Sequence, residues 1–123
     1  MGKLTTHILD VSAGKPAAQV RIDLYKVEKG GSEAAQTVTK LRSVTTNSDG
    51  RCDEALLSGA DFVAGQYALE FHIGDYFDAL GLTLPEPKFI DIVVIRFGVA
   101  DSDANYHVPL LVSPYGYSTY RGS

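Results

Sequence analysis

Three side chains of this 123-residue sequence could act together on a small, carbonyl-rich compound: His7, Arg51 and His107. A histidine exchanges protons near neutral pH because its ordinary pKa is about 6.5, so either one could be a general base, a general acid or a ligand for water. The rigid guanidinium fork of Arg51 could grip an anionic, planar ligand through two parallel hydrogen bonds. Each residue also has an ordinary explanation, because single histidines on apolar strand faces are usually core residues and arginines after turns are usually solvated.

Motifs for metals and covalent nucleophiles are missing from the sequence. None of the three histidines belongs to a His-Glu-x-x-His pattern, and Cys52 has no second cysteine to pair with. Residues 101–105 open like a calcium loop, but Tyr106 and Val112 stand where such a loop needs glycine and glutamate. There is no glycine-rich phosphate loop and no Gly-x-Ser-x-Gly elbow. We therefore predict chemistry without a metal or a cofactor.

The last eleven residues have an unusual composition for a chain end. Residues 113–123 hold three of the seven tyrosines in the sequence. The simplest interpretation is a frayed terminus, as most termini are. Tyrosine, however, offers a rigid surface with a hydroxyl group, which is typical of binding sites rather than of mobile tails.

Alternating apolar and polar residues predict the strands that must position these groups. Residues 20–24 and 66–73 alternate with a period of two, and residues 4–11 and 37–46 are rich in β-branched residues. This pattern places His7 on the face of Thr5 and Leu9, whereas His72 falls on a polar face and is expected to be solvated. Turn clusters such as Asp49-Gly50 separate the strands. The only helical segment is residues 75–80, which Asp75 could cap and Gly81 could end.

Two further strands are apolar on both faces. They cover residues 89–97 and 106–112, and the second one carries His107 on the face of Pro109 and Leu111. Because one short helix cannot cover a sheet, another subunit is the natural cover. Pro109 lacks an N–H group and is predicted to lie at an edge or a bulge. With about eight short strands, we predict an all-β fold, an antiparallel β-sandwich that forms a single domain over residues 1–123.

Charge and terminal composition limit the possible partners. The net charge of −4 disfavours binding to the nucleic-acid backbone. Residues 1–10 contain no long apolar run, so we expect neither a signal peptide nor a membrane span. The final Arg-Gly-Ser is not the peroxisomal Ser-Lys-Leu signal. A lone Cys52 suits a reducing compartment, so the expected location is the cytoplasm.

Blocks from one end of the chain to the other resemble the 5-hydroxyisourate hydrolases of the transthyretin-like family. These blocks are residues 6–10, 14–17, 49–51, 74–77, 106–111 and the final Tyr120-Arg121-Gly122-Ser123. The final tetrapeptide is the most specific of them, since it separates the hydrolases from transthyretin, a thyroid-hormone carrier of the same fold. No motif position departs from the hydrolase pattern.

The resemblance implies a transthyretin-like sandwich and a site built from its matching residues. His7, Arg51 and His107 would be catalytic, and the substrate would also contact Tyr120, Arg121, Gly122 and Ser123. The implied reaction opens a lactam ring of 5-hydroxyisourate in urate breakdown, giving 2-oxo-4-hydroxy-4-carboxy-5-ureidoimidazoline. The implied assembly is a homotetramer with sites between its dimers. Three alternatives stay open: which histidine is the base, a transthyretin-like protein that binds a small ligand without catalysis, and a purely structural sandwich module.

Overall fold

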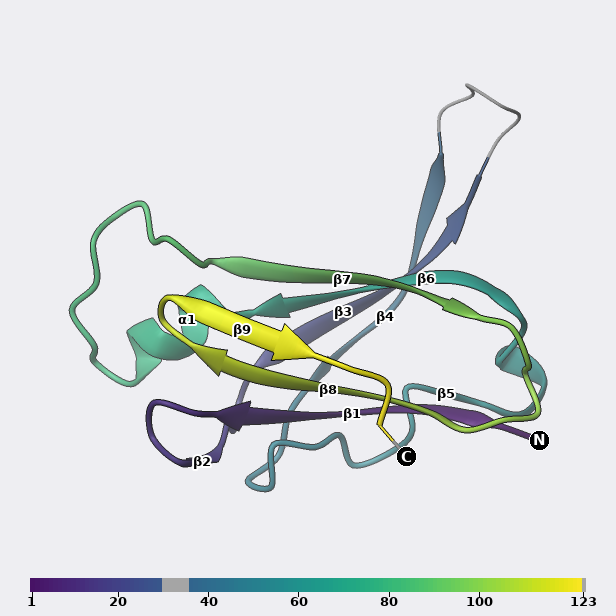
Figure 1. The fold of residues 1–123 in the computed structure, drawn as a ribbon, viewed down its shortest axis with the longest axis horizontal. Helices are drawn as coiled ribbons and strands as arrows, with labels where there is room; N and C mark the ends of the chain where they lie inside the picture. Colours follow the sequence, from purple (N-terminus) through teal and green to yellow (C-terminus); the bar gives the residue numbers. More distant parts are fainter. Residues whose placement is uncertain (30–35, 123) are drawn as a thin grey trace.

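The computed structural model of the protein describes residues 1–29 and 36–122 and shows a sandwich of two β-sheets (Figure 1). One sheet has the strand order β2-β1-β8-β9, with β5 also paired to β1, and the other has the order β4-β3-β6-β7. The strands are β1 (Lys3–Asp10), β2 (Lys15–Pro16), β3 (Arg21–Glu28), β4 (Thr37–Thr45), β5 (Leu57–Ser58), β6 (Gly65–His72), β7 (Ile92–Val99), β8 (Tyr106–Ser113) and β9 (Gly116–Thr119). The all-β prediction is confirmed.

The period-two pattern explains which side chains fill the space between the sheets. In β1, Leu4 and Ile8 are fully buried, whereas the alternate residues Thr5 and His7 are only half-buried. The same rule buries Ile22 of β3 and Leu110 of β8. The resulting core consists of apolar side chains from both sheets and leaves the outward face of each sheet for polar residues.

One strand pair departs from the predicted antiparallel arrangement, and it determines the site. Strands β1 and β8 run parallel, with Thr5 beside His107 and His7 beside Pro109. The side chains of Thr5, His7 and His107 therefore all point away from the core on one face of the β2-β1-β8-β9 sheet. Segments about a hundred residues apart in the sequence become neighbours through this register.

The helix begins earlier than the sequence predicts. Helix α1 covers Ile73–Ala79, so Asp75 lies in its first turn rather than at its N-cap. The predicted stop at Gly81 agrees with its positive φ of 81°. Tyr76 donates a hydrogen bond of 2.8 Å from its hydroxyl to the buried Asp10 carboxylate, which ties the helix to the end of β1. A second short element is the 3-10 helix Gly59–Asp61.

Pro109 does not lie in an edge strand, because β8 is paired on both sides by β1 and β9. The ladder between β8 and β9 ends at Leu110 and Thr119, one residue before Pro109 is reached. The Pro109 carbonyl accepts a hydrogen bond from the Thr119 hydroxyl at 2.7 Å, so the proline nitrogen also faces the side where β9 has ended. The missing N–H therefore removes no ladder hydrogen bond at this position.

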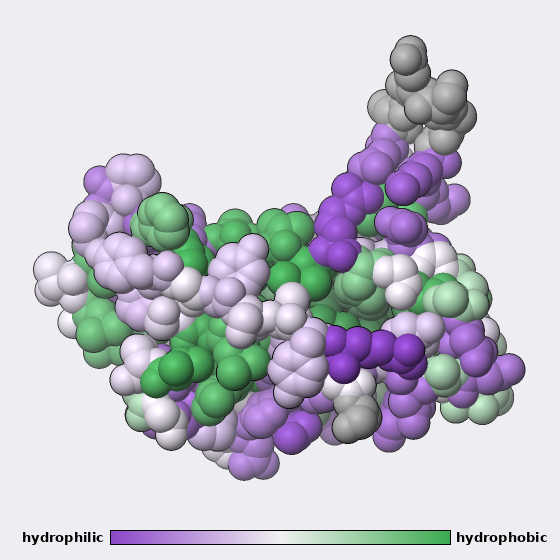
Figure 2. Space-filling model, in the orientation of Figure 1, coloured by the Kyte–Doolittle hydropathy of each residue, from purple (hydrophilic) through white to green (hydrophobic). Residues whose placement is uncertain are grey.

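Strands β7 and β9 each form a free edge of their sheet in the isolated chain. Exposed apolar side chains lie along both, including Ile92 and Val94 of β7 and Tyr117 of β9. The space-filling view shows apolar surface over β7 and over the region of β8 and β9 (Figure 2). In the part of the chain that the structure describes, no helix is long and apolar enough to cross a membrane.

Candidate active site

The outward face of the β2-β1-β8-β9 sheet brings His7 and His107 together. His7 comes from β1 and His107 from β8, and their ladder positions are two residues apart in the parallel register. Both side chains are half-buried, and the buried ring of Pro109 lies beside His7 on the same face. The two histidines that the sequence singles out are therefore neighbours on one surface.

A tight turn delivers Arg51 to the same face. Gly50 has a φ of 71°, and a Cβ there would lie 2.5 Å from the Ile8 carbonyl oxygen, so only glycine fits. The Ile8 N–H donates to the Gly50 carbonyl at 2.9 Å, and the next residue, Arg51, forms a bridge with His7. The side-chain oxygen of Asn47 accepts hydrogen bonds from the backbone N–H groups of Asp49 and Arg51. Arg51 is thus held beside His7 by the backbone itself.

The electrostatics of the face favour neutral histidines. Burial lowers the pKa of His7, and the positive charge of Arg51 lowers it further, partly offset by Asp49. Burial also lowers the pKa of His107, with smaller contributions from Arg51 and His7. Because both pKa values fall below 6.5, each imidazole is neutral at pH 7 and keeps one nitrogen able to accept a proton.

The tail is ordered and packs on His107. Strand β9 pairs with β8, and the Gly122 N–H then donates a hydrogen bond of 2.7 Å to the His107 carbonyl. A Cβ on Gly122 would lie 2.6 Å from Cδ2 of His107, so this glycine allows the tail to approach the ring directly. The interpretation of the tail as a frayed terminus is therefore wrong for residues 116–122.

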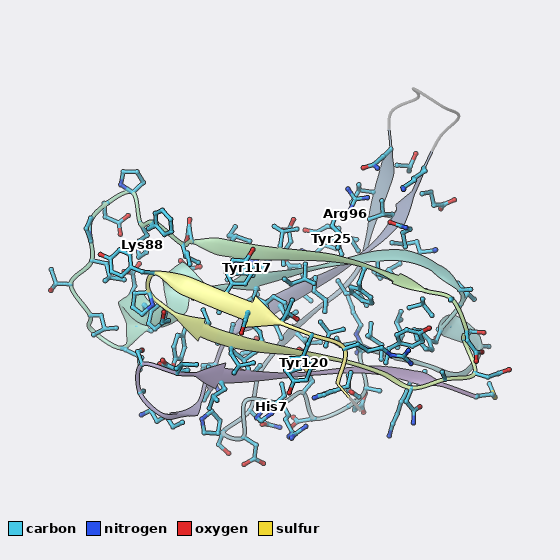
Figure 3. All side chains as sticks on the ribbon, viewed as in Figure 1. His7, Tyr25, Lys88, Arg96, Tyr117 and Tyr120 are labelled. Atoms are coloured by element: carbon cyan, nitrogen blue, oxygen red, sulfur yellow. The ribbon has the colours of Figure 1, made fainter. Side chains whose placement is uncertain are left out.

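The other tail residues occupy different environments. The Arg121 guanidinium lies 4.1 Å from the centre of the Tyr106 ring and donates to the Asn105 carbonyl at 3.2 Å. Tyr120 is 61% exposed and comes from the tail after β9, whereas His7 comes from β1 (Figure 3). Ser123 lies outside the described residues. Arg121 is thus engaged by the loop before β8, while Tyr120 is free to contact a ligand.

Sequence reasoning missed Thr5, whose hydroxyl oxygen lies 2.9 Å from Nδ1 of His107. Its position on the face of His7 was predictable from the alternation. The contact with His107 was not, because it depends on the register between strands that lie 102 residues apart.

The site is an open face in the single chain rather than a closed pocket. A hollow of about 220 Å³ is lined by residues that include Thr5, Arg51 and Cys52, but it contains neither histidine. A more apolar hollow of about 250 Å³ lies between β7 and the tail and reaches Tyr120 and Arg121. A ligand on the two histidines would therefore stay open to solvent unless another surface covered it.

His72 belongs to a separate cluster on the outward face of the other sheet. It is not solvated as expected: its side chain is 16% exposed and its Nε2 lies 3.0 Å from the buried carboxylate of Asp23. Burial alone would raise the pKa of Asp23, but hydrogen bonds from Ser43, Arg21 and His72 outweigh it and hold that pKa far below its usual range. Ligand atoms of Asp23, Glu70 and His72 lie within 4.8 Å of one another, a grouping that could hold a metal ion. Arg21 and Lys40 already supply positive charge to Asp23, so we regard it as an ion-pair cluster.

Comparison with known proteins identifies relatives over the whole chain. Residues 4–122 match the sequence pattern described as the HIUase/Transthyretin family. The chain is 54% identical over 122 residues to 5-hydroxyisourate hydrolase 2 of Rhizobium meliloti (strain 1021), covering 99% of this chain and 97% of that protein.

Solved structures with the same fold include enzymes of two names. The structure of Klebsiella pneumoniae 5-hydroxyisourate hydrolase matches with a TM-score of 0.76 and 33% identity, over 100% of this chain and 94% of that one. The crystal structure of (S)-allantoin synthase matches with a TM-score of 0.90 and 40% identity. The match covers 99% of this chain but only 44% of that protein, so this chain spans less than half of its length.

Proposed function

The chain belongs to the HIUase/Transthyretin family, and from this premise we propose how its own residues carry out the hydrolysis of 5-hydroxyisourate. The chain is an enzyme of purine catabolism with this activity, as its similarity to 5-hydroxyisourate hydrolases over nearly the full length supports. The observation that carries the mechanism is the placement of His7, His107 and Arg51 on one outward face, with both histidine pKa values lowered.

The reaction begins with attack of water on a lactam carbonyl of the substrate. The substrate is a planar, electron-poor bicycle, so its carbonyl carbons are good targets for a nucleophile. One histidine, His7 or His107, takes the proton from the water, and the other holds the reacting groups in place. Neutral imidazoles suit both tasks at pH 7, because each has one nitrogen that accepts a hydrogen bond and one that donates.

Arg51 stabilises the negative charge that develops on the carbonyl oxygen. Its guanidinium can offer two parallel N–H groups to an oxyanion or to neighbouring carbonyl oxygens of the ring. Comparable oxyanion donors contribute roughly 3–4 kcal/mol to the transition state. The bridge between Arg51 and His7 keeps the base and the charge-stabilising group at a fixed spacing.

The tail completes the substrate site. Tyr120 supplies an exposed ring that can hold the planar substrate, and Gly122 packs on the catalytic His107. Arg121 and Ser123 are proposed as further substrate-binding residues, and the contact of Arg121 with Tyr106 also fixes the path of the tail. Precise positioning of this kind is a major source of rate enhancement.

The activity and the two histidines can be tested in one assay. Freshly generated 5-hydroxyisourate should be turned over by the protein, followed as loss of ultraviolet absorbance. His7→Asn and His107→Asn should each lower kcat/KM at least about tenfold, the low end for a group that transfers or directs a proton.

His72→Asn is the matched control for these variants. His72 lies on the opposite sheet and contacts Asp23, so its replacement should lower the unfolding midpoint while leaving turnover nearly unchanged. A fast His107→Asn enzyme together with a slow His72→Asn enzyme would show that the wrong face has been assigned.

We further propose that the chain assembles as a homotetramer with its sites between dimers. The open histidine face and the free edges of β7 and β9, which expose Ile92, Val94 and Tyr117, support this assembly. Size-exclusion chromatography with light scattering should give four times the chain mass. A monomer at micromolar concentration would contradict both the tetramer and a site closed by a second copy.

We also propose a cytoplasmic location for this enzyme, with the small-molecule substrate as its ligand and with no nucleic-acid or membrane partner. The lone Cys52 suits a reducing compartment, and the net charge of −4 disfavours nucleic acid.

A further inference from the structure

A threonine hydroxyl lies against the inner nitrogen of His107. Thr5 Oγ1 is 2.9 Å from His107 Nδ1, within hydrogen-bond distance. The contact follows from the parallel register of β1 and β8, which places the two residues side by side on the outward face. Both side chains are half-buried, so the hydrogen bond is partly shielded from water.

The tail closes the opposite side of the same ring. Gly122 packs against the Cδ2 edge, where a Cβ would come within 2.6 Å. In an imidazole, Nδ1 and Cδ2 flank the carbon that joins the ring to the backbone. With Thr5 on one flank and Gly122 on the other, the remaining ring atoms, Cε1 and Nε2, point away from the sheet. Strand β8 lies between β1 and β9 in the sheet, in agreement with these two contacts (Figure 1).

The hydroxyl proton of Thr5 decides which ring nitrogen carries the histidine proton. Within residues 1–29 and 36–122, Nδ1 of His107 is the only acceptor in hydrogen-bond contact with this hydroxyl. A hydroxyl that donates to Nδ1 uses the lone pair of that nitrogen, so the neutral ring must carry its proton on Nε2. Burial and the charge of Arg51 lower the pKa of His107, which keeps the ring in this neutral form at pH 7.

We infer that Thr5 is a positioning residue that holds His107 as a hydrogen-bond donor, with its Nε2 proton directed away from the sheet toward the substrate. This inference rests on the proposed hydrolysis and goes beyond it by dividing the work of the two histidines. A protonated Nε2 has no lone pair to accept a proton from water. The general base is therefore His7, the histidine that forms a bridge with Arg51.

The division of roles gives a balanced reaction. As the water oxygen bonds to the lactam carbonyl carbon, a water proton moves to His7. The carbonyl oxygen becomes an oxyanion and accepts hydrogen bonds from His107 Nε2 and from Arg51. The carbon–nitrogen bond then breaks with its electron pair on nitrogen, which takes the proton back from His7. One water molecule is added across one amide bond, and both histidines return to their starting states.

The test compares two replacements of Thr5. Thr5→Val keeps the shape of the side chain but removes the hydroxyl, and Thr5→Ser keeps the hydroxyl. We expect Thr5→Val to lower kcat at least about tenfold with little change in KM, and Thr5→Ser to recover most of the loss. Thr39→Val, on an exposed position of β4 in the other sheet, should match the unsubstituted protein.

Nitrogen-15 NMR of the histidine rings reads the tautomer without any turnover. In the unsubstituted protein His107 should carry its proton on Nε2, and Thr5→Val should shift the ring toward the other tautomer at an unchanged unfolding midpoint. A proton on Nδ1 in the unsubstituted protein, or a Thr5→Val enzyme with full kcat, would overturn the role of Thr5. A protein with the expected tautomer that turns over no 5-hydroxyisourate would instead contradict the proposed function.

Discussion

Replacing Arg51 with glutamine should lower kcat/KM about a hundredfold to a thousandfold, the range measured when an oxyanion donor is removed. The loss should appear mainly in kcat, because the charge that Arg51 meets develops only in the transition state. The turn that holds residue 51 depends on Gly50 and Asn47 rather than on the arginine side chain, so the fold should be kept.

The same substitution should also move the titration of both histidines. The positive charge of Arg51 lowers the pKa of His7 and of His107, so its removal should raise both pKa values. A raised pKa means that the imidazoles become protonated, and unable to act, at a higher pH. As pH falls, the glutamine variant should therefore lose its residual activity earlier than the unsubstituted enzyme does.

Arg51→Lys separates the charge of this side chain from its geometry. Lysine keeps the positive charge, so the histidine pKa values should stay low, but it lacks the planar fork that makes two parallel hydrogen bonds. NMR titration of the histidine rings and rates measured across pH would check both expectations. Histidine pKa values that stay the same in Arg51→Gln would show that this charge does not reach the rings.

Local patterns in the sequence were sufficient to predict most of the strands. The alternation in residues 4–11 and 66–73 agrees with β1 and β6 to within a residue or two, because one face of each strand is buried. Helix α1 begins two residues before the predicted segment, at Ile73. Ile73 continues the apolar alternation of β6, so its pattern alone assigns it to the strand rather than to the helix.

The features that were missed depend on long-range pairing. Strand β9 is only four residues long and lies among turn-forming residues, so it has too little alternation to detect. The polar face of His72 was recognised, but its burial comes from Asp23 and from the side chains around it on a neighbouring strand. Pro109 was assigned to an edge because a proline excludes a ladder hydrogen bond, and only the length of β9 shows where that bond would have been absent anyway.

The candidate site was predictable as a set of residues but not as an arrangement. Residue types and the family resemblance selected His7, Arg51 and His107, and the structure brings these three to one face. Their order across the face, with Arg51 beside His7 and Thr5 beside His107, depends on the register of β1 with its neighbours. A shift of that register by one residue would turn one histidine into the core.

Deleting residues 120–123 should leave a folded protein that has lost about a hundredfold or more in turnover, because loose positioning alone can have that effect. The core strands end before Tyr120, and the lost contacts are few: the Gly122 hydrogen bond to His107 and the packing of Arg121 on Tyr106. The latter contributes about 0.5–1 kcal/mol at an exposed position. Thermal unfolding and initial rates on the same sample should therefore show a small change in the midpoint and a large one in rate.

A single substitution within the tail shows whether the deletion acts through His107. Gly122→Ala introduces a Cβ that would lie 2.6 Å from Cδ2 of that ring, so the ring or the tail must move, and turnover should fall while the rest of the tail stays present. Gly116→Ala is the matched control, because its Cβ would come no closer than 3.8 Å to any neighbouring atom. An active deletion would mean that Tyr120–Ser123 marks the family without serving the reaction. A slow deletion combined with a fast Gly122→Ala enzyme would instead place the effect on Tyr120, whose exposed ring is the other candidate for holding the substrate.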